Sequence, residues 1–232
     1  MPHAHAHAAI LSIGDELVLG QTLNSNSRWL ATRLADLGIL TREHVTVPDD
    51  ASAHAAAVRR LAATNDLIIS TGGLGPTDDD LTRLVMSDVL GSPLIEDAQS
   101  LQQIEAWFTS RGRAMPEINR VQAKRPTIAT AIANPHGTAP GLHARVSTGS
   151  HACDVYCLPG PPSEMMPMFE QVVSNLRPPG KRRVITRVLP CFGMGESEIA
   201  MRLGGLMARD ASPLVGTTAS GGVVSCRIRY EG

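Results

Sequence analysis

The sequence predicts an α/β fold: a mostly parallel sheet with helices on both faces, followed by a small α+β piece. Short apolar runs alternate with segments whose apolar residues recur at helical spacing, and turn residues separate them. Repeated strand–helix alternation is typical of parallel sheets with right-handed crossovers. The chain has 232 residues, 43% hydrophobic and 19% charged, which is enough to bury a sizeable core and excludes a disordered protein.

The N-terminal part of the chain predicts three strand–helix units. The strands are expected at 8–13, 39–47 and 67–69, and the helices at 24–37, 50–61 and 81–89. Asn24 and Asp50 are residue types that cap helix N-termini, whereas Gly38 and Gly91 are typical of helix ends.

The middle of the chain predicts further helices separated by rigid loops. Helices are expected over 97–111, 116–121 and 165–173, a strand over 155–158, and a Pro- and Gly-rich loop over 134–141. The methionines of the last helix are predicted to fill the core.

A Pro-Pro-Gly segment followed by three basic residues, 178–183, predicts a linker. After it, strands are expected at 184–189 and 223–230 and a helix near 196–207. The predicted domains are therefore 8–177 and a partial one at 181–232. Residues 1–7 contain His3, His5 and His7 and are predicted to be disordered.

Composition excludes several classes of protein. A net charge of −1 argues against general nucleic-acid binding, which needs clustered cations. No apolar run approaches the ~20 residues of a membrane span, and the first residues lack the features of a signal peptide. The four cysteines show no metal-finger spacing, which indicates free thiols in a reducing cytosol. We expect a soluble cytoplasmic protein that binds neither nucleic acid nor membrane.

A glycine-rich segment, Thr71-Gly72-Gly73-Leu74-Gly75, follows the third predicted strand and precedes a helix. Glycine lets backbone N–H groups approach a phosphate closely, and a helix N-terminus adds positive potential. A tight turn between strand and helix explains the same residues, which match neither a Walker loop nor a Rossmann fingerprint. On the residues alone, both interpretations stand.

Acidic residues follow the same strands. Asp78-Asp79-Asp80 comes directly after the glycines, and Asp15, Glu16, Asp49 and Asp50 follow the first two strands. Because the ligand crevice of such sheets lies at the strand carboxyl ends, we expect these acids to converge. Mg²⁺ bridges carboxylates of this kind to substrate phosphates. Each acid alone also fits a solvated loop.

Four motifs occur in order along the chain: Ile13-Gly14-Asp15-Glu16-Leu17, the segment from Thr71 to Thr82, Asn134 through Gly141, and Pro159-Gly160 with Glu164. Together they resemble the CinA (competence/damage-inducible protein) family, a branch of the MoaB/Mog molybdopterin-binding fold, over about residues 8–177. The segment 193–198 is similar to the start of the KH-like domain of these proteins.

The resemblance implies a three-layer domain that binds a nucleotide or pterin phosphate. In the CinA branch this domain is associated with metal-dependent hydrolysis of ADP-ribose to AMP and ribose 5-phosphate, so we expect a nucleotide pyrophosphatase. The enzymatic alternative is molybdopterin adenylylation, as in the Mog and gephyrin branch. The other alternative is a module that binds a nucleotide or pterin without turnover. The family also implies a homo-oligomer, a dimer or trimer.

The resemblance, with the motifs, assigns a role to each site residue. Asp15, Asp49 and Asp80 are the expected ligands of a divalent cation, Mg²⁺ or Co²⁺, with K⁺ as a further candidate. Asp79, Asp80 and Glu164 are the expected catalytic residues, and Asp79 or Glu164 orients the attacking water. The expected substrate-binding residues are Asn26, Thr71, Gly72, Gly73, Gly75, Pro76, Thr77, Asn134, Gly137, Thr138, Ala139, Pro140, Gly141, Pro159 and Gly160.

The sequence departs from the family pattern at two positions. Asn24 stands where many relatives carry Asp, and Pro161 replaces the usual Val. Against the family pattern, we expect the sequence to end within the KH-like region and to lack the amidase domain. We therefore do not expect nicotinamide-nucleotide deamidation, the family's other activity.

Overall fold

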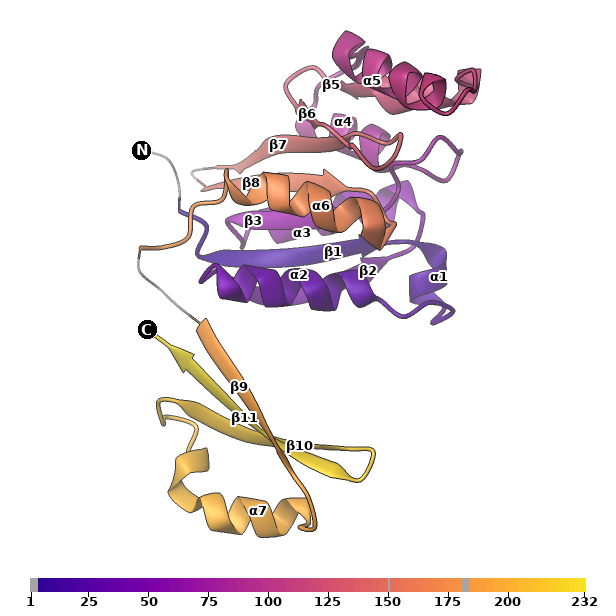
Figure 1. The fold of residues 1–232 in the computed structure, drawn as a ribbon. Coiled ribbons are helices and arrows are strands. Elements are labelled where there is room, and N and C mark those ends of the chain that lie inside the picture. The colour runs from indigo at the N-terminus through magenta and orange to yellow at the C-terminus, as the bar shows by residue number, and fades with distance from the viewer. Residues whose placement is uncertain (1–3, 150, 181–183) are drawn as a thin grey trace.

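The computed structural model describes residues 4–149, 151–180 and 184–232. Its larger unit is built on a six-stranded sheet with the spatial order β2-β1-β3-β8-β7-β6 (Figure 1). The strands are β1 (His7–Ile13), β2 (Leu40–Val47), β3 (Leu67–Thr71), β6 (Thr130–Ile132), β7 (Gly141–Thr148) and β8 (His151–Leu158). β2, β1, β3 and β8 run parallel to one another. β7 pairs antiparallel with β8, and β6 pairs antiparallel with β7. The predicted mostly parallel sheet is confirmed.

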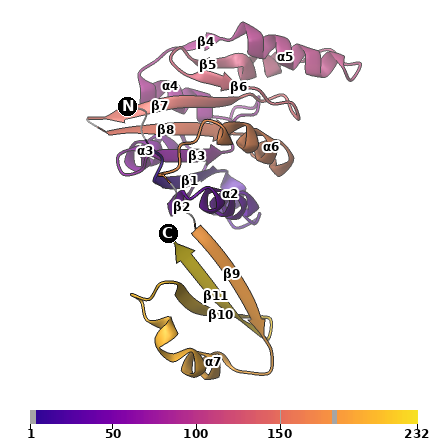
Figure 2. The same cartoon turned by 60° about the vertical axis from the view of Figure 1, so that its left-hand side comes forward.

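Helices cover both faces of this sheet and form three layers (Figure 2). The helices are α1 (Asp15–Val18), α2 (Ser25–Asp36), α3 (Ala51–Ala62), α4 (Thr82–Leu90), α5 (Ala98–Thr109), α6 (Pro162–Val173) and the 3₁₀ helix η1 (Glu117–Ala123). On one face, Leu30 of α2 and Phe169 of α6 pack against β1 and β3. On the other, Leu61 of α3 and Met86 of α4 pack against the alternate residues of the same strands.

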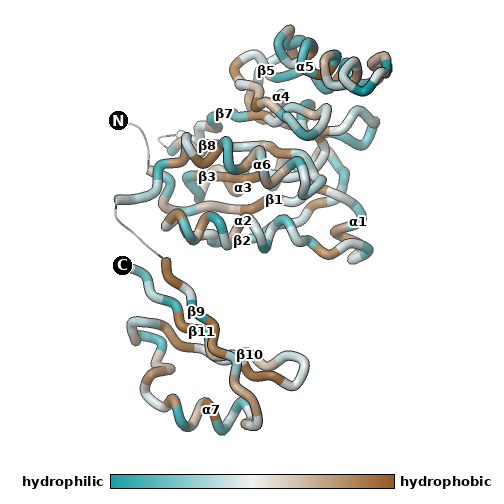
Figure 3. The backbone as a smooth tube through the Cα atoms, in the orientation of Figure 1, coloured by the Kyte–Doolittle hydropathy of each residue, from teal (hydrophilic) through white to brown (hydrophobic). Residues whose placement is uncertain are grey.

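The central strands are buried on both sides, which explains their composition. Every residue of β3 is buried, and β1 is buried from its second residue onward. Strands covered on both faces read as continuous apolar runs and not as alternating ones. Hydrophobic residues accordingly gather along the central strands (Figure 3).

Side-chain caps set the helix boundaries close to where the sequence predicts them. The Asn24 side chain accepts the Ser27 N–H at 3.0 Å, and Asp50 accepts the Ala53 N–H at 2.7 Å. Such caps satisfy backbone donors that have no partner inside the helix. Gly91 ends α4 in the left-handed conformation, as its residue type predicts.

Several elements were not predicted. β7 forms an antiparallel hairpin with β8, and β4 (Leu94–Glu96) pairs with β5 (Lys124–Pro126). The predicted helix after Pro116 is the 3₁₀ helix η1. Three-residue strands carry too little periodicity to be recognised. β7 did carry a signal, because apolar and polar residues alternate from Leu142 to Val146, and the apolar ones are buried.

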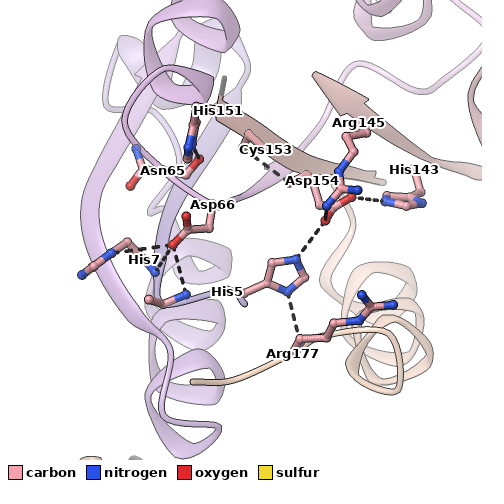
Figure 4. Close-up of polar contacts among 11 residues, drawn as sticks. His5, His7, Asn65, Asp66, His143, Arg145, His151, Cys153, Asp154 and Arg177 are labelled. Carbon is pink, nitrogen blue, oxygen red and sulfur yellow. Dashed lines mark hydrogen bonds and ion pairs between the residues drawn. The ribbon is translucent and has the colours of Figure 1, made fainter. Parts of the chain in front are cut away.

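The N-terminal histidines belong to the fold. His5 is 2% exposed, its Nε2 lies 3.0 Å from an Asp154 carboxylate oxygen, and its Nδ1 accepts the Arg177 N–H at 3.1 Å (Figure 4). The prediction of a disordered segment 1–7 is therefore wrong from residue 4 onward, because partners distant in sequence hold it. His3 lies outside the described residues.

A smaller unit follows the linker, of which residues 181–183 lie outside the described part of the chain. It consists of β9 (Val184–Cys191), α7 (Glu196–Leu203), the 3₁₀ helix η2 (Gly204–Met207), β10 (Leu214–Ser220) and β11 (Val223–Glu231). The strands form an antiparallel sheet in the order β10-β11-β9, and Ile199 of α7 packs on it. Across the described ranges of both units, no helix is long and apolar enough to cross a membrane.

Candidate functional site

A cavity of about 310 Å³ lies at the carboxyl ends of β1, β2, β3 and β8. All four sequence motifs contribute to its walls. Three of them follow the parallel strands β1, β3 and β8, whose carboxyl ends share one sheet edge. The fourth, 134–141, connects the antiparallel strands β6 and β7. The predicted residues that line the cavity are Asp49, Gly72, Gly73, Gly75, Asp79, Asp80, Thr138, Ala139, Pro159, Gly160 and Glu164.

The loop after β3 depends on glycine at two positions. Gly72 and Gly73 have φ angles of 104° and 64°, which side-chain-bearing residues rarely adopt. A Cβ on Gly72 would clash with the carbonyl oxygen of Ile13, and one on Gly73 with the Thr82 hydroxyl. That hydroxyl donates to the Gly72 carbonyl oxygen at 2.9 Å and ties the loop to the start of α4.

Only some of the glycine N–H groups that were expected to bind a phosphate are free to do so. The Gly72 N–H donates to the Leu158 carbonyl at 3.1 Å, and the Gly75 N–H donates to Asp80 Oδ1 at 2.7 Å. The expectation that these two amides hold a phosphate therefore conflicts with the bonds they already make. Within the described chain, the N–H groups of Gly73 and Gly160 have no hydrogen-bond partner. Both line the cavity and remain available to an anion.

Asp80 shapes its own loop. Its Oδ1 accepts the Gly75 N–H, and its Oδ2 accepts the Thr77 N–H at 2.9 Å and the Thr77 hydroxyl at 2.5 Å. These three hydrogen bonds explain the position of the Asp80 carboxylate without a metal ion. Its predicted role as a metal ligand stays a prediction.

Arg83 supports the same loop from inside the protein, and the sequence reasoning missed it. It is 2% exposed, and its guanidinium donates to the carbonyl oxygens of Leu74 and Gly75. Gln122 of η1 also donates to the Leu74 carbonyl, at 3.4 Å. A charged residue inside an apolar helix pattern is the signal that could have identified Arg83, since a buried arginine needs partners.

Asp15 and Asp49 meet at the carboxyl ends of β1 and β2, as predicted. The Asp15 N–H donates to Asp49 Oδ2 at 3.0 Å, and the Asp49 N–H donates to Asp15 Oδ1 at 3.2 Å. Burial raises the pKa of Asp49, and the negative charges of Asp15, Glu16 and Asp79 raise it further, against the bond from the Asp15 N–H. Glu16 lines the cavity, as the expected convergence of the acids after the strands implies, although it was not among the predicted metal ligands or catalytic residues.

Glu164 is held in place from the loop between β6 and β7. Asn134 Nδ2 donates to Glu164 Oε2 at 2.7 Å and also to the Ala139 carbonyl at 3.0 Å. A Cβ on Gly137 would clash with the Glu164 carboxylate, so this loop packs directly on it. Asn134 and Gly137 therefore position Glu164 and do not line the cavity themselves.

A smaller cavity of about 130 Å³ adjoins the first and shares Ile13, Glu16 and Gly160 with it. Asn26 and Thr71, both predicted to bind substrate, line this second cavity. Asn26 Nδ2 donates to the Gly160 carbonyl at 2.7 Å. Among the residues described, no hydrogen-bond donor reaches its buried Oδ1.

Four other predicted substrate-binding residues lie away from both cavities. Pro76 and Thr77 line a separate cavity of about 600 Å³ behind the loop, with Arg83. Pro140 is buried, and Gly141 begins β7, where a Cβ would lie 2.7 Å from the Cys157 carbonyl oxygen. Their positions support the fold of the walls and provide no contact surface in the cavity.

The predicted metal ligands do not form a ready-made site. In the ranges that the structure describes, no group of three or more His, Cys, Asp or Glu side chains is arranged to hold a metal ion. Asp15 and Asp49 are paired with each other's backbone, and Asp80 is bound into its loop. The predicted cation stays a prediction.

Comparisons with known proteins match both units. A family model described as a probable molybdopterin binding domain matches residues 9–178, and one described as the damage-inducible protein CinA KH domain matches residues 186–232. A curated protein of Symbiobacterium thermophilum, named as a competence-damage inducible protein, is 42% identical over 225 residues, 95% of this chain and 52% of the relative. The chain thus spans about half the length of the curated relatives it matches.

Solved structures resemble the larger unit. The crystal structure of CinA from Thermoplasma acidophilum has a TM-score of 0.66 and 30% identity, covering 74% of this chain and 99% of that one. The tungsten cofactor synthesizing protein MoaB from Pyrococcus furiosus has a TM-score of 0.53 and 15% identity, covering 75% and 94%. The second likeness shows the fold alone.

Proposed function

The chain belongs to the CinA family, with a probable molybdopterin binding domain and a KH domain, and from this premise we propose that its cavity binds a nucleotide or pterin through a phosphate group. The observation that carries the proposal is that the N–H groups of Gly73 and Gly160 line one cavity and have no hydrogen-bond partner among the described residues. Each precedes a helix, α4 or α6, whose N-terminal end favours an anion.

The charge of the cavity implies that the phosphate binds together with a cation. Five carboxylates line it, and none of its described lining residues is basic: the acids are Glu16, Asp49, Asp79, Asp80 and Glu164. A phosphate alone would be repelled by these charges. We therefore propose a divalent cation, Mg²⁺ or Co²⁺, as the counter-charge.

Asp49 is the carboxylate best suited to hold that cation. Its raised pKa reflects burial and the charges of Asp15, Glu16 and Asp79, which a cation would offset. We propose Asp49, Glu16 and Asp79 as the ligands, in place of the predicted trio with Asp80. Because these three carboxylates are not arranged as a metal site in the described chain, they would have to draw together when the cation binds. When bound, the cation polarises a phosphoryl oxygen of the substrate.

We further propose that the nucleotide is ADP-ribose and that the protein hydrolyses it to AMP and ribose 5-phosphate. Glu164 accepts a proton from the attacking water, whose oxygen bonds to phosphorus while the anhydride P–O bond breaks. Asn134 fixes one Glu164 oxygen at 2.7 Å. Among described residues the other oxygen has no hydrogen bond and is free to act as the base.

The smaller cavity is proposed to hold the heterocyclic base. Because Asn26 Nδ2 is bound to the Gly160 carbonyl, its Oδ1 has a fixed direction and lacks a donor among the residues described. A buried acceptor without a partner costs about 1–3 kcal/mol. An N–H group of adenine or of a pterin would supply the missing donor.

The test incubates the chain with ADP-ribose and with other nucleoside diphosphate derivatives, with and without Mg²⁺ or Co²⁺, and measures AMP. We expect AMP from ADP-ribose only when the metal is present. Glu164→Gln should lower kcat by about 10²–10⁴-fold with unchanged ADP-ribose affinity, since it removes the base and keeps the shape. Glu105→Gln, an exposed residue of α5, is the matched control and should keep full activity.

Asp80→Asn separates loop support from metal binding. If Asp80 only shapes the loop, the variant loses melting temperature together with activity, and added metal restores neither. A variant that keeps its melting temperature but needs a higher metal concentration for activity would instead identify Asp80 as a metal ligand.

The alternative, a protein that binds the ligand without turnover, is supported by one observation. In the described chain, no three acidic, histidine or cysteine side chains are already arranged to hold a metal ion. Saturable ADP-ribose binding by calorimetry without AMP release would make this protein a binding module. AMP transfer from ATP to molybdopterin would place it with the Mog-type enzymes.

A further inference from the structure

Two cysteines of the smaller unit lie in contact. Cys191 is the last residue of β9 and Cys226 lies in β11, strands that run side by side (Figures 1 and 2). Cys191 pairs with Val224, so Cys226, two residues further along, shares its sheet face. The two Sγ atoms are 3.7 Å apart, and both thiols are free.

The two sulfurs differ in accessibility. Cys191 is half-buried, whereas Cys226 is 7% exposed and packs with Ile199 under α7. Burial, and then the hydrogen bond and charge of Cys191, raise the pKa of the Cys226 thiol. A reagent from solution therefore reaches Cys191 first.

The other two cysteines cannot form such a pair. Cys153 and Cys157 lie four residues apart on the single strand β8, which separates their Cα atoms by about 13 Å. A disulfide requires Cα atoms within about 7 Å. Both are buried, and burial raises the pKa of the Cys157 thiol to about 12, so they are unreactive internal controls.

We propose that Cys191 and Cys226 form a reversible intramolecular disulfide by exchange with a low-molecular-weight disulfide of the glutathione type. The sulfurs must close from 3.7 Å to about 2.05 Å. Cys191 ends a strand that pairs on one side only, since β9 is at the edge of the sheet. Fewer backbone hydrogen bonds therefore restrain Cys191 than would restrain a residue of a central strand.

The exchange proceeds in two steps. The Cys191 thiolate attacks one sulfur of the reagent, breaks its S–S bond and releases one thiolate. Cys226 then loses its proton, attacks the Cys191 sulfur of the mixed disulfide and expels the second thiolate. Two protein thiols are oxidised to one S–S bond, and one external disulfide is reduced to two thiols, which take up the two protons.

The disulfide would stabilise the smaller unit, which has a small hydrophobic core of its own. The buried apolar residues described in its cluster are Ile199, Val224 and Cys226. Units of this size commonly need a disulfide, a metal or a partner for stability. The closed loop would contain α7, η2 and β10, whose unfolded chain it constrains. The lining of the nucleotide cavity lies entirely in the larger unit and is untouched.

The test incubates the full chain with oxidised glutathione and follows intact mass and peptide maps. We expect the loss of two hydrogens, a peptide that links Cys191 to Cys226, and reversal by dithiothreitol. Thermal unfolding of the smaller unit should move up by several degrees on oxidation.

Single variants identify the two sulfurs. Cys226→Ser should stop at one glutathione on Cys191, Cys191→Ser should show no linked peptide, and Cys153→Ser, the control, should keep the linkage. The proposal would be overturned if Cys191 and Cys226 both remained free thiols after incubation with oxidised glutathione. It would also be overturned if the unaltered chain kept a lasting mixed disulfide on Cys191. A loss of two hydrogens that survives in Cys191→Ser would overturn it as well.

Discussion

Arg83 and His54 are buried titratable side chains in helices that begin at the candidate site. Burial lowers both pKa values, that of Arg83 to about 10 and that of His54 to about 4. Arg83 stays charged at neutral pH and donates to two loop carbonyls. His54 is 1% exposed, and no described residue bonds to either ring nitrogen, so it is neutral. One side chain supports the loop as a cation, and the other fits the core only without charge.

Because burial lowers the pKa of His54, we expect acid to destabilise the fold. The pKa of His54 is lower in the folded chain than its ordinary value of 6.5, so the unfolded chain binds the proton more tightly. Its contribution is complete above pH 6.5 and is lost as the pH falls toward 4. The free energy of unfolding, measured in urea at pH 7 and at pH 4.5, should fall by about 2–3 kcal/mol from this residue.

A matched pair of variants isolates that contribution, because carboxylates also titrate at low pH. His54→Met should flatten the fall by about the same amount, whereas His44→Met, at an exposed position of β2, should leave it unchanged. An identical pH dependence in His54→Met and the unaltered chain would contradict the prediction.

At the scale of elements, one end of the sheet is held together by histidine–aspartate contacts (Figure 4). Asp154 of β8 contacts His5 and His143, each at 3.0 Å through a different oxygen. Burial alone would raise the pKa of Asp154, but bonds from His143 and His5 and the charge of Arg145 lower it well below its ordinary range. Through His5 the N-terminal segment also binds Arg177, after α6. The first and last parts of the larger unit are thereby joined.

His5→Ala should loosen this junction. The variant leaves Asp154 and the Arg177 N–H each without one partner, which costs about 1–3 kcal/mol in unfolding free energy. Proteolysis between α6 and β9 should become faster, measured against His44→Ala as the exposed control. Unchanged stability and cleavage would show that the contact contributes nothing.

At the scale of the molecule, the two units have separate cores, and each holds its own candidate site. The candidate cavity is lined by residues between Ile13 and Glu164, whereas the cysteine pair lies in the smaller unit. The larger unit contains both extended apolar clusters that sandwich the six-stranded sheet. It therefore has the core that independent folding requires.

Truncation after residue 180 should leave ligand binding intact. The shortened chain keeps every described wall of the cavity, so its affinity for ADP-ribose, measured by calorimetry in the presence of Mg²⁺, should match that of the full chain. Binding that disappears while circular dichroism still reports a folded domain would mean that the smaller unit contributes to the site.

Local residue patterns by themselves determined most of the fold. Periodicity identified the four parallel strands of the larger sheet and every helix of eight or more residues in the described chain. Capping residues such as Asn24 and Asp50 marked where helices begin. These signals are local, since a cap or an apolar stripe acts within a few residues. The order of strands also placed the loops after the first three strands at one sheet edge, and the cavity lies there.

Only the tertiary structure decided what each polar group does in that cavity. Gly75 and Asp80 were predicted to face a ligand, but they bond to each other. His5 was predicted to be disordered, but it bonds to Asp154, 149 residues away. A hydrogen-bonding group satisfies itself with whichever partner the fold brings nearest, and that partner is set by long-range packing, on which a short stretch of sequence carries no information.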